Sequence, residues 1–187
     1  MTKCHARKTL LFIKIDFVNI MKEKINILNI NQVNQKINRL AWQVYENNFQ
    51  QKEIVLIGID KKGLFLAEKI SECLNEISKI KTIVAELSID KSLDVNSSMS
   101  LNISDDIFTD KAVIIVDDVL NSGKTLMYAS KLFLNTTLKK LSILVLIDRN
   151  HNLFPIKADF IGLSLSTTLK EYITVDLFGD NKGVYLS

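Results

Sequence analysis

The run Ala112–Val116 and the two carboxylates that follow it constrain the fold of this chain more than any other feature. The run is apolar and rich in β-branched residues, and it ends at Asp117 and Asp118. A short polar turn then leads into a helical pattern that begins after Lys124. Continuous apolar strands are typical of parallel sheets that are covered on both faces. The pattern therefore predicts an α/β domain in which a buried strand delivers two charges to one edge of the sheet.

The turn Leu120–Thr125 has the composition of a phosphate-binding loop. In open parallel sheets, ligands bind beyond the carboxyl ends of the strands, and backbone N–H groups before a helix bind phosphate. Carboxylates next to such a loop indicate a phosphorylated sugar. A nucleoside-triphosphate loop is excluded, because Asp118 stands where that motif needs its first glycine. A purely structural acidic turn is the remaining alternative, but paired acids at a strand end are uncommon in such turns.

The composition predicts one globular domain with little linker. The chain has 187 residues, is 47% hydrophobic, and contains one proline and six glycines. Residues 1–24 carry a net charge of +4, so the rest of the chain carries −1 of the total +3. This balance argues against a nonspecific nucleic-acid binder. We expect residues 1–20 to be an N-terminal extension outside the fold, and residues 21–187 to be a single domain.

Two further features predict a cytoplasmic protein that does not enter a membrane. Cys4 and Cys73 have neither metal-site spacing nor a disulfide pattern, as is usual in a reducing compartment. The apolar stretch Thr9–Ile13 is interrupted by Lys14 and Asp16, and it is too short to cross a bilayer.

Hydrophobic periodicity predicts the order of the elements along the chain. Apolar residues at helical spacing predict two helices, and continuous or alternating apolar runs predict the strands. Residues 89–110 lack any periodicity and are predicted to form a mobile loop. The predicted helices cover 31–45 and 64–74 and a third follows Lys124; the predicted strands are 54–59, 82–87, 112–117 and 142–148, with short strands near 160–161 and 172–175.

Three polar loops follow the predicted strands, and parallel strands would bring them to one edge of the sheet. These loops are Gly58–Gly63, Asp117–Thr125 and Asp148–His151. We therefore expect a single pocket that is formed by all three.

The segment Val116–Thr125 resembles the phosphoribosyl diphosphate motif of type I phosphoribosyltransferases. The resemblance extends over Leu56–Ala67 and Leu146–Gly162, and it is closest to the family of bifunctional pyrimidine operon regulators and uracil phosphoribosyltransferases. It implies a central parallel twisted sheet flanked by helices, with a small hood from the terminal segments. It also implies transfer of phosphoribose to uracil, giving UMP and diphosphate, in a homodimer or higher homo-oligomer.

The resemblance also implies roles for individual residues. Asp117 and Asp118 would hydrogen-bond the ribose hydroxyls, stabilise the cationic sugar and hold Mg²⁺ as the cofactor. The side chain of Lys124 is expected to supply auxiliary charge, and that of His151 to lie at the base end. The implied substrate-binding residues are Lys61, Lys62, Gly63, Val119, Leu120, Asn121, Ser122, Gly123, Lys124, Thr125, Arg149 and His151.

The chain departs from the family pattern in three places. Lys61 and Lys62 replace a Thr-Arg pair, which predicts weaker diphosphate binding because lysine lacks the arginine fork. Asn150 replaces a glycine, a mild change because asparagine tolerates left-handed backbone. The predicted lid 89–110 is acidic, with Lys91 as its one basic residue, which predicts slow turnover.

Two other functions stay open at this point. One is a regulator that senses UMP and binds a messenger RNA leader, although the charge of −1 beyond residue 24 argues against a strongly basic RNA-binding face. The other is a phosphoribosyltransferase that acts on a purine base, which the segment Asp148–His151 makes less favourable.

Overall fold

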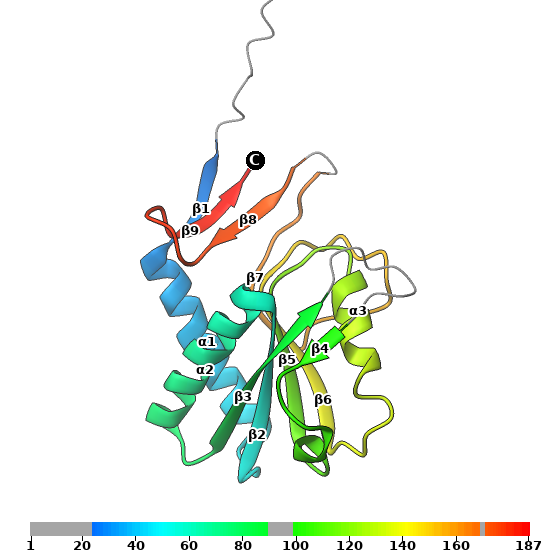
Figure 1. The fold of residues 1–187 in the computed structure, drawn as a ribbon. Helices are drawn as coiled ribbons and strands as arrows, with labels where there is room; N and C mark the ends of the chain where they lie inside the picture. The colour runs from blue at the N-terminus through cyan, green and yellow to red at the C-terminus, as the bar shows by residue number, and fades with distance from the viewer. Residues whose placement is uncertain (1–23, 90–98, 169–170) are drawn as a thin grey trace, which may run out of the picture.

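The central element of the fold is a six-stranded sheet with the strand order β4-β3-β2-β5-β6-β7 (Figure 1). The computed structural model describes residues 24–89, 99–168 and 171–187. All strands of this sheet are parallel except the edge strand β4, which runs antiparallel to β3. Its strands are β2 (Glu53–Ile59), β3 (Lys81–Ile89), β4 (Met99–Leu101), β5 (Ala112–Leu120), β6 (Lys140–Asp148) and β7 (Phe160–Ser164).

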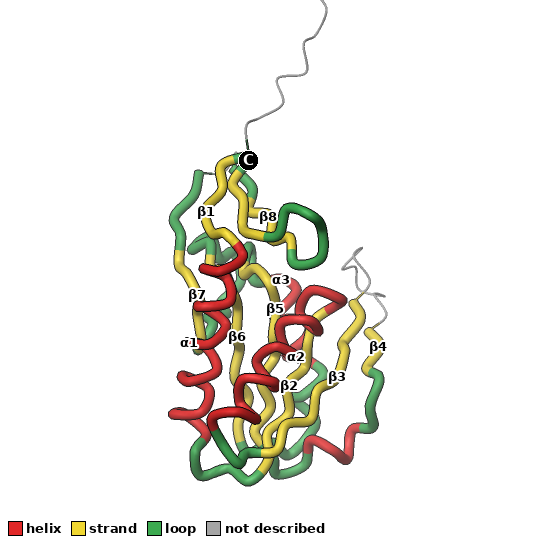
Figure 2. The backbone as a smooth tube through the Cα atoms, turned by 90° about the vertical axis from the view of Figure 1, so that its left-hand side faces the viewer, coloured by secondary structure: helices red, strands yellow, loops and turns green. Residues whose placement is uncertain are grey.

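Helices cover both faces of this sheet, as the continuous apolar strands require. The helices α1 (Ile30–Asn48) and α2 (Asp60–Ile77) lie side by side on one face, and α3 (Lys124–Lys131) lies on the other (Figure 2). Alternate residues of one strand enter different cores: Leu56 packs with the α1 and α2 side, whereas Ile57 packs with the α3 side. No helix of the described segments is long and apolar enough to span a membrane.

A second, three-stranded antiparallel sheet forms a hood beyond the carboxyl ends of the parallel strands (Figure 1). It consists of β1 (Ile25–Asn29), β9 (Gly183–Leu186) and β8 (Ile173–Asp176), in the order β1-β9-β8. Asn29 ends β1 and caps α1 in a reciprocal capping box with Gln32, so the hood passes directly into the first helix. Phe178, just after β8, packs edge-on against Phe65 of α2 with ring centroids 5.1 Å apart.

The structure confirms the predicted α/β class and the hood, and it corrects several element boundaries. The predicted strand 112–117 continues through both acids to Leu120, because residues up to Leu120 still pair with β6. The predicted turn Asp60–Gly63 is the first turn of α2. Within the predicted loop 89–110, β4 pairs with β3 and a short 3-10 helix spans Asp105–Phe108, while residues 90–98 of the predicted lid lie outside the described residues.

Candidate functional site

The three predicted loops do meet at one edge of the sheet, beyond β2, β5 and β6. The parallel pairing of these strands brings the loops together. A cavity of about 620 Å³ opens there and is lined by Ile59, Asp60, Lys61, Lys62, Glu86, Ser88, Ile89, Asp117 and Asp118. A smaller pocket of about 110 Å³ adjoins it through Asp117 and is lined by Val119, Leu120, Asn121, Ser122, Gly123, Thr125 and Leu126. The site therefore combines a carboxylate-lined cavity with a small pocket walled mostly by residues of Leu120–Thr125, here called the phosphate loop, whereas the loop Asp148–His151 lines neither of them.

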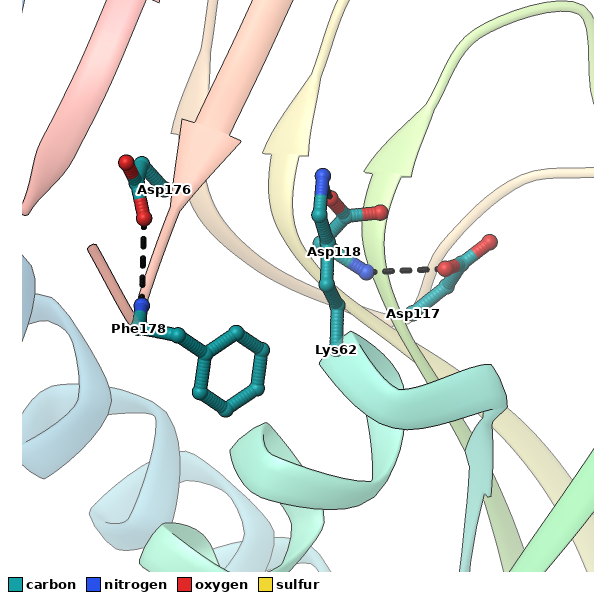
Figure 3. Close-up of polar contacts among 5 residues, drawn as sticks. All are labelled: Lys62, Asp117, Asp118, Asp176 and Phe178. Atoms are coloured by element: carbon teal, nitrogen blue, oxygen red, sulfur yellow. Dashed lines mark hydrogen bonds and ion pairs between the residues drawn. The ribbon is translucent and has the colours of Figure 1, made fainter.

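The paired acids differ in their partners (Figure 3). Asp118 forms an ion pair with Lys62, with its Oδ2 atom 3.1 Å from the Lys62 Nζ atom. The Oδ1 atom of Asp117 accepts a hydrogen bond of 2.9 Å from the backbone N–H of Asp118. Asp118 is thus neutralised by a lysine of α2, whereas Asp117 forms no ion pair among the described residues.

The pKa of Asp117 is raised well above its ordinary value. Burial disfavours the charged carboxylate and is the larger cause, and the negative charge of the neighbouring Asp118 adds to it. A carboxyl group with a raised pKa is poised to exchange a proton or to gain charge when a cation binds next to it.

We expect Asp117→Asn to stabilise the protein increasingly as the pH rises above the ordinary carboxyl pKa of 3.8. The folded state holds the Asp117 proton more tightly than the unfolded chain does, so the wild-type unfolding free energy falls as pH rises toward the raised pKa. The Asp117→Asn side chain keeps the Oδ1 acceptor but does not titrate, so the unfolding free energy of the variant lacks this fall. Urea unfolding of both proteins from acidic to neutral pH measures the difference, and a difference that is independent of pH would contradict the assignment.

Asp176→Asn provides a control of opposite sign. The Asp176 carboxylate accepts hydrogen bonds from the N–H groups of Gly179 and Phe178, and these lower its pKa. Figure 3 shows the bond from Phe178. Its contribution to stability is present above the ordinary pKa and is lost as pH falls. The Asp176→Asn protein is therefore expected to lose stability relative to wild type as pH rises.

The start of α2 places Lys61 and Lys62 next to the acids. Asp60 has a left-handed φ of 49°, and its Oδ1 atom accepts a hydrogen bond from the N–H of Ile89. The helix can begin directly at the end of β2 because Gly58 and Gly63 have no side chains: a Cβ atom on Gly58 would lie 2.3 Å from Leu64, and one on Gly63 would lie 2.5 Å from the carbonyl oxygen of Val116.

The loop that follows β6 holds the phosphate loop in place through backbone hydrogen bonds. The Ser122 carbonyl accepts hydrogen bonds from the N–H groups of Leu153 and Phe154. Gly123 has a φ of 84° and caps α3, whose first N–H groups lack carbonyl partners within the helix. Loop amides and a helix start are the groups that bind phosphate in other proteins.

Lys124 is the one predicted residue of this loop whose side chain does not line the small pocket. Its Nζ atom lies 5.9 Å from the centroid of the Tyr128 ring. The auxiliary role of Lys124 stays a prediction.

The loop after β6 carries the remaining predicted residues. Asn150 adopts the left-handed backbone expected of it, with a φ of 54°, and its N–H donates to the buried carboxylate of Asp148. The side chain of His151 is half-buried. Arg149 is 5% exposed, and its guanidinium donates to Asn121, Thr167 and Thr168. The structure therefore brings Arg149 to the phosphate loop, with its side chain among protein acceptors.

The residues of the cavity fit a magnesium ion that is shared with a substrate. Oxygen ligands suit Mg²⁺, which is usually held by one or two carboxylates together with substrate phosphates. Asp117 and Asp118 supply two such groups on one cavity wall. The described residues contain no cluster of three acidic, histidine or cysteine side chains that would form a complete cage. The donor set therefore suits a metal ion that arrives with an oxygen-rich ligand.

A larger cavity of about 790 Å³ lies at the opposite end of the sheet. Its lining includes Phe49, Ile77 and Lys79, together with Glu53 and Lys81 at the amino ends of β2 and β3. It has neither the paired carboxylates nor the loop before a helix, so the chemical groups place the candidate site at the smaller cavity.

Sequence reasoning missed the contribution of β3 to the site. Glu86 and Ser88 line the cavity because β3 lies next to β2 in the sheet. Both are polar residues near the carboxyl end of a strand, which is the signal that could have identified them. The position of β3 in the strand order was the missing information.

Comparison with known proteins gives a consistent result. The family described as "Phosphoribosyl transferase domain" matches residues 25–176. The chain is 34% identical over 163 residues to the "Bifunctional protein PyrR" of Clostridium kluyveri, covering 84% of this chain and 92% of that protein. It is 32% identical over 166 residues to the protein of the same name from Bacillus cereus, with the same two coverages.

Solved structures share the fold at lower sequence identity. A hypoxanthine-guanine phosphoribosyltransferase from Bacillus anthracis has a TM-score of 0.70 and 22% identity, covering 87% of this chain and 95% of that one. A hypoxanthine phosphoribosyltransferase from Trypanosoma cruzi has a TM-score of 0.71 and 14% identity, covering 87% and 93%. At these identities the similarity concerns the fold alone.

Proposed function

Since this chain belongs to the phosphoribosyl transferase domain family, we propose that it transfers phosphoribose from phosphoribosyl diphosphate to uracil and releases UMP and diphosphate. The observation that carries the proposal is that Asp117 and Asp118 line the cavity and that Asp117 also lines the small pocket of the phosphate loop. A sugar that is bound through its 5′-phosphate in the small pocket would place its hydroxyls against these acids.

The paired acids would act on the ribose. Breaking the bond between C1′ and diphosphate builds positive charge on the sugar, as in glycoside hydrolysis. The carboxylates of Asp117 and Asp118 would accept hydrogen bonds from the ribose hydroxyls and stabilise that charge. The two residues would also hold Mg²⁺, which when bound neutralises negative charge on the diphosphate leaving group.

Lys61, Lys62 and Gly63 would form the diphosphate side of the site. Both lysines line the cavity of the paired acids. Lys62 can reach Asp118 and is 44% exposed, so its ammonium group has room to approach a diphosphate oxygen. Val119, Leu120, Asn121, Ser122, Gly123 and Thr125 would enclose the 5′-phosphate, Lys124 would add charge, and the turn with Arg149 and His151 would lie at the base end.

The proposed reaction is tested by incubating the protein with phosphoribosyl diphosphate, Mg²⁺ and each of the radiolabelled bases uracil, hypoxanthine, guanine, xanthine and orotate. We expect UMP as the main product. A purine nucleotide as the main product would show that the substrate is a purine base and not uracil. Failure to convert any base, at protein concentrations that detect slow turnover, would contradict the enzymatic proposal.

A second candidate function is suggested by the relatives, which are named as bifunctional proteins, and by the resemblance to pyrimidine operon regulators. We propose binding of a messenger RNA leader as that second function. RNA affinity depends on neutralised phosphates and falls steeply with salt. Filter binding of pyrimidine leader RNA over a range of salt concentrations tests it, and absence of binding at low salt removes this candidate.

Three further expectations accompany this proposal. We propose a homodimer or higher homo-oligomer, which sedimentation equilibrium measures. We also propose a cytoplasmic location, supported by the absence of any disulfide pattern in the cysteine spacing. The proposed domain covers residues 21–187, and residues 1–20 are proposed to be an extension that lies outside the described residues.

A further inference from the structure

Arg149 is a buried cation that joins three separate parts of the molecule. It is 5% exposed and sits at the carboxyl end of β6. Its Nη1 group donates to the Asn121 side chain of the phosphate loop at 2.8 Å. Its Nε group donates to Thr167 Oγ1 at 2.5 Å and its Nη2 group to the Thr168 carbonyl at 2.8 Å, both in the segment that leads to the hood.

The contacts of Arg149 extend to the backbone and into the hood. Its N–H donates to the carbonyl of Leu120 at 3.1 Å, which adds a second bond to the phosphate loop. Its guanidinium carbon lies 5.8 Å from the centroid of the Tyr172 ring, next to β8. Through this one residue, the phosphate loop and the start of the hood are connected.

The chemistry of these contacts makes them sensitive to geometry. A buried guanidinium is strongly destabilising unless its N–H groups are hydrogen-bonded. Within the part of the chain that the structure describes, Arg149 forms no ion pair, and its three side-chain acceptors are neutral oxygens. Displacing the Asn121 side chain would therefore leave a buried charge short of a partner, and the planar fork would have to shift relative to Thr167 and Thr168.

We infer that Arg149 is a positioning residue that couples occupancy of the phosphate loop to base affinity beneath the hood. The inference rests on the proposed function, because the two coupled ligands are a sugar phosphate and a nucleobase. Phosphate in the small pocket fixes the loop that carries Asn121. The position of the Arg149 guanidinium is then set by its hydrogen bond to Asn121, and the positions of Thr167 and Thr168 are set by their hydrogen bonds from Arg149. Each ligand then raises the affinity for the other by the same factor, as thermodynamic linkage requires.

Arg149→Lys is the main test variant, since it keeps the charge and removes the planar fork. Uracil affinity is measured by calorimetry with and without saturating ribose 5-phosphate, which has no leaving group and cannot react. In the wild type we expect ribose 5-phosphate to tighten uracil binding by about tenfold. In Arg149→Lys we expect this factor to fall to about one, with each ligand still binding by itself.

Two additional variants make the test decisive. Thr167→Val removes only the hydroxyl acceptor on the hood side, so it should also reduce the coupling factor, and it serves if Arg149→Lys does not fold. Arg39→Lys makes the same chemical change at an exposed position of α1 and should leave the factor unchanged. Loss of general structure would lower the unfolding temperature without acting selectively on the coupling factor.

The outcomes separate this inference from the proposed function. Wild-type binding of both ligands without coupling would overturn the inference alone, and so would coupling that survives in Arg149→Lys or Thr167→Val. A wild-type protein that binds neither ligand would overturn the proposed function, and the role of Arg149 with it.

Discussion

Asp118→Asn is expected to reduce UMP formation by about 10²- to 10³-fold, the range found when one electrostatic contact to a transition state is removed. The amide has the shape of the carboxylate but not its charge. It would neither stabilise positive charge on the ribose nor pair with Lys62, whose Nζ atom lies 3.1 Å from the wild-type carboxylate. Initial rates at saturating uracil and phosphoribosyl diphosphate measure the loss.

Asp110→Asn is the matched control for this substitution. It removes one carboxylate at an exposed position ahead of β5, where the left-handed φ of 57° is tolerated by asparagine. We expect wild-type rates from it. Equal rates for Asp118→Asn and wild type, with both proteins folded, would remove Asp118 from the catalytic site.

Gly123→Ala is expected to raise the KM for phosphoribosyl diphosphate by about 5- to 150-fold, which corresponds to about 1–3 kcal/mol. Forcing a non-glycine residue into an unfavourable backbone region has a penalty of this order. At Gly123 the φ is 84°, and an added Cβ atom would lie 2.5 Å from the Cγ2 atom of Ile156. The loop can relieve both problems only by moving, and this changes the shape of the small pocket.

The double variant Gly123→Ala with Ile156→Ala separates the two causes. It removes the clash with Cγ2 but keeps the unfavourable backbone angle, so we expect a partial recovery of the KM relative to Gly123→Ala. Ile156→Ala alone reports the effect of lost packing. A Gly123→Ala protein with a wild-type KM would show that the loop binds no phosphate in this conformation.

The features that could be predicted from the sequence are those with a strong local signal. The apolar runs of β2, β5 and β6 predicted three parallel strands, and the pairing of these strands confirms them. The polar residues after each strand predicted one shared site, which stays a prediction. The left-handed backbone of Asn150 agrees with the glycine that the resembled family has at this position, because asparagine is one of the few residues that tolerate that backbone.

The features that were missed depend on partners distant in sequence. The strand β9 is four residues long, and only its pairing with β1 and β8 identifies it. The first turn of α2 was predicted to be a turn because Asp60, Lys61, Lys62 and Gly63 are polar or flexible. Its helical form depends on how closely Gly63 approaches the Val116 carbonyl on another strand.

The role of Arg149 shows a limit of another kind. Its place within a motif predicted that it binds substrate, and the structure places its side chain among protein acceptors. The direction of the side chain depends on Asn121 and Thr167, which are 28 and 18 residues away in sequence. No local pattern reports such a network of hydrogen bonds.

The pairing of β1 with β9 has a consequence for the order of folding. Ile25 pairs with Leu186, so the hood joins residues from nearly opposite ends of the folded chain, and closing so long a loop is entropically slow. On the ribosome, the parallel sheet and its paired acids can assemble before β9 emerges from the exit tunnel. The hood can be completed only after β9 has emerged, so the turn Leu120–Thr125 is expected to form earlier in synthesis than the hood.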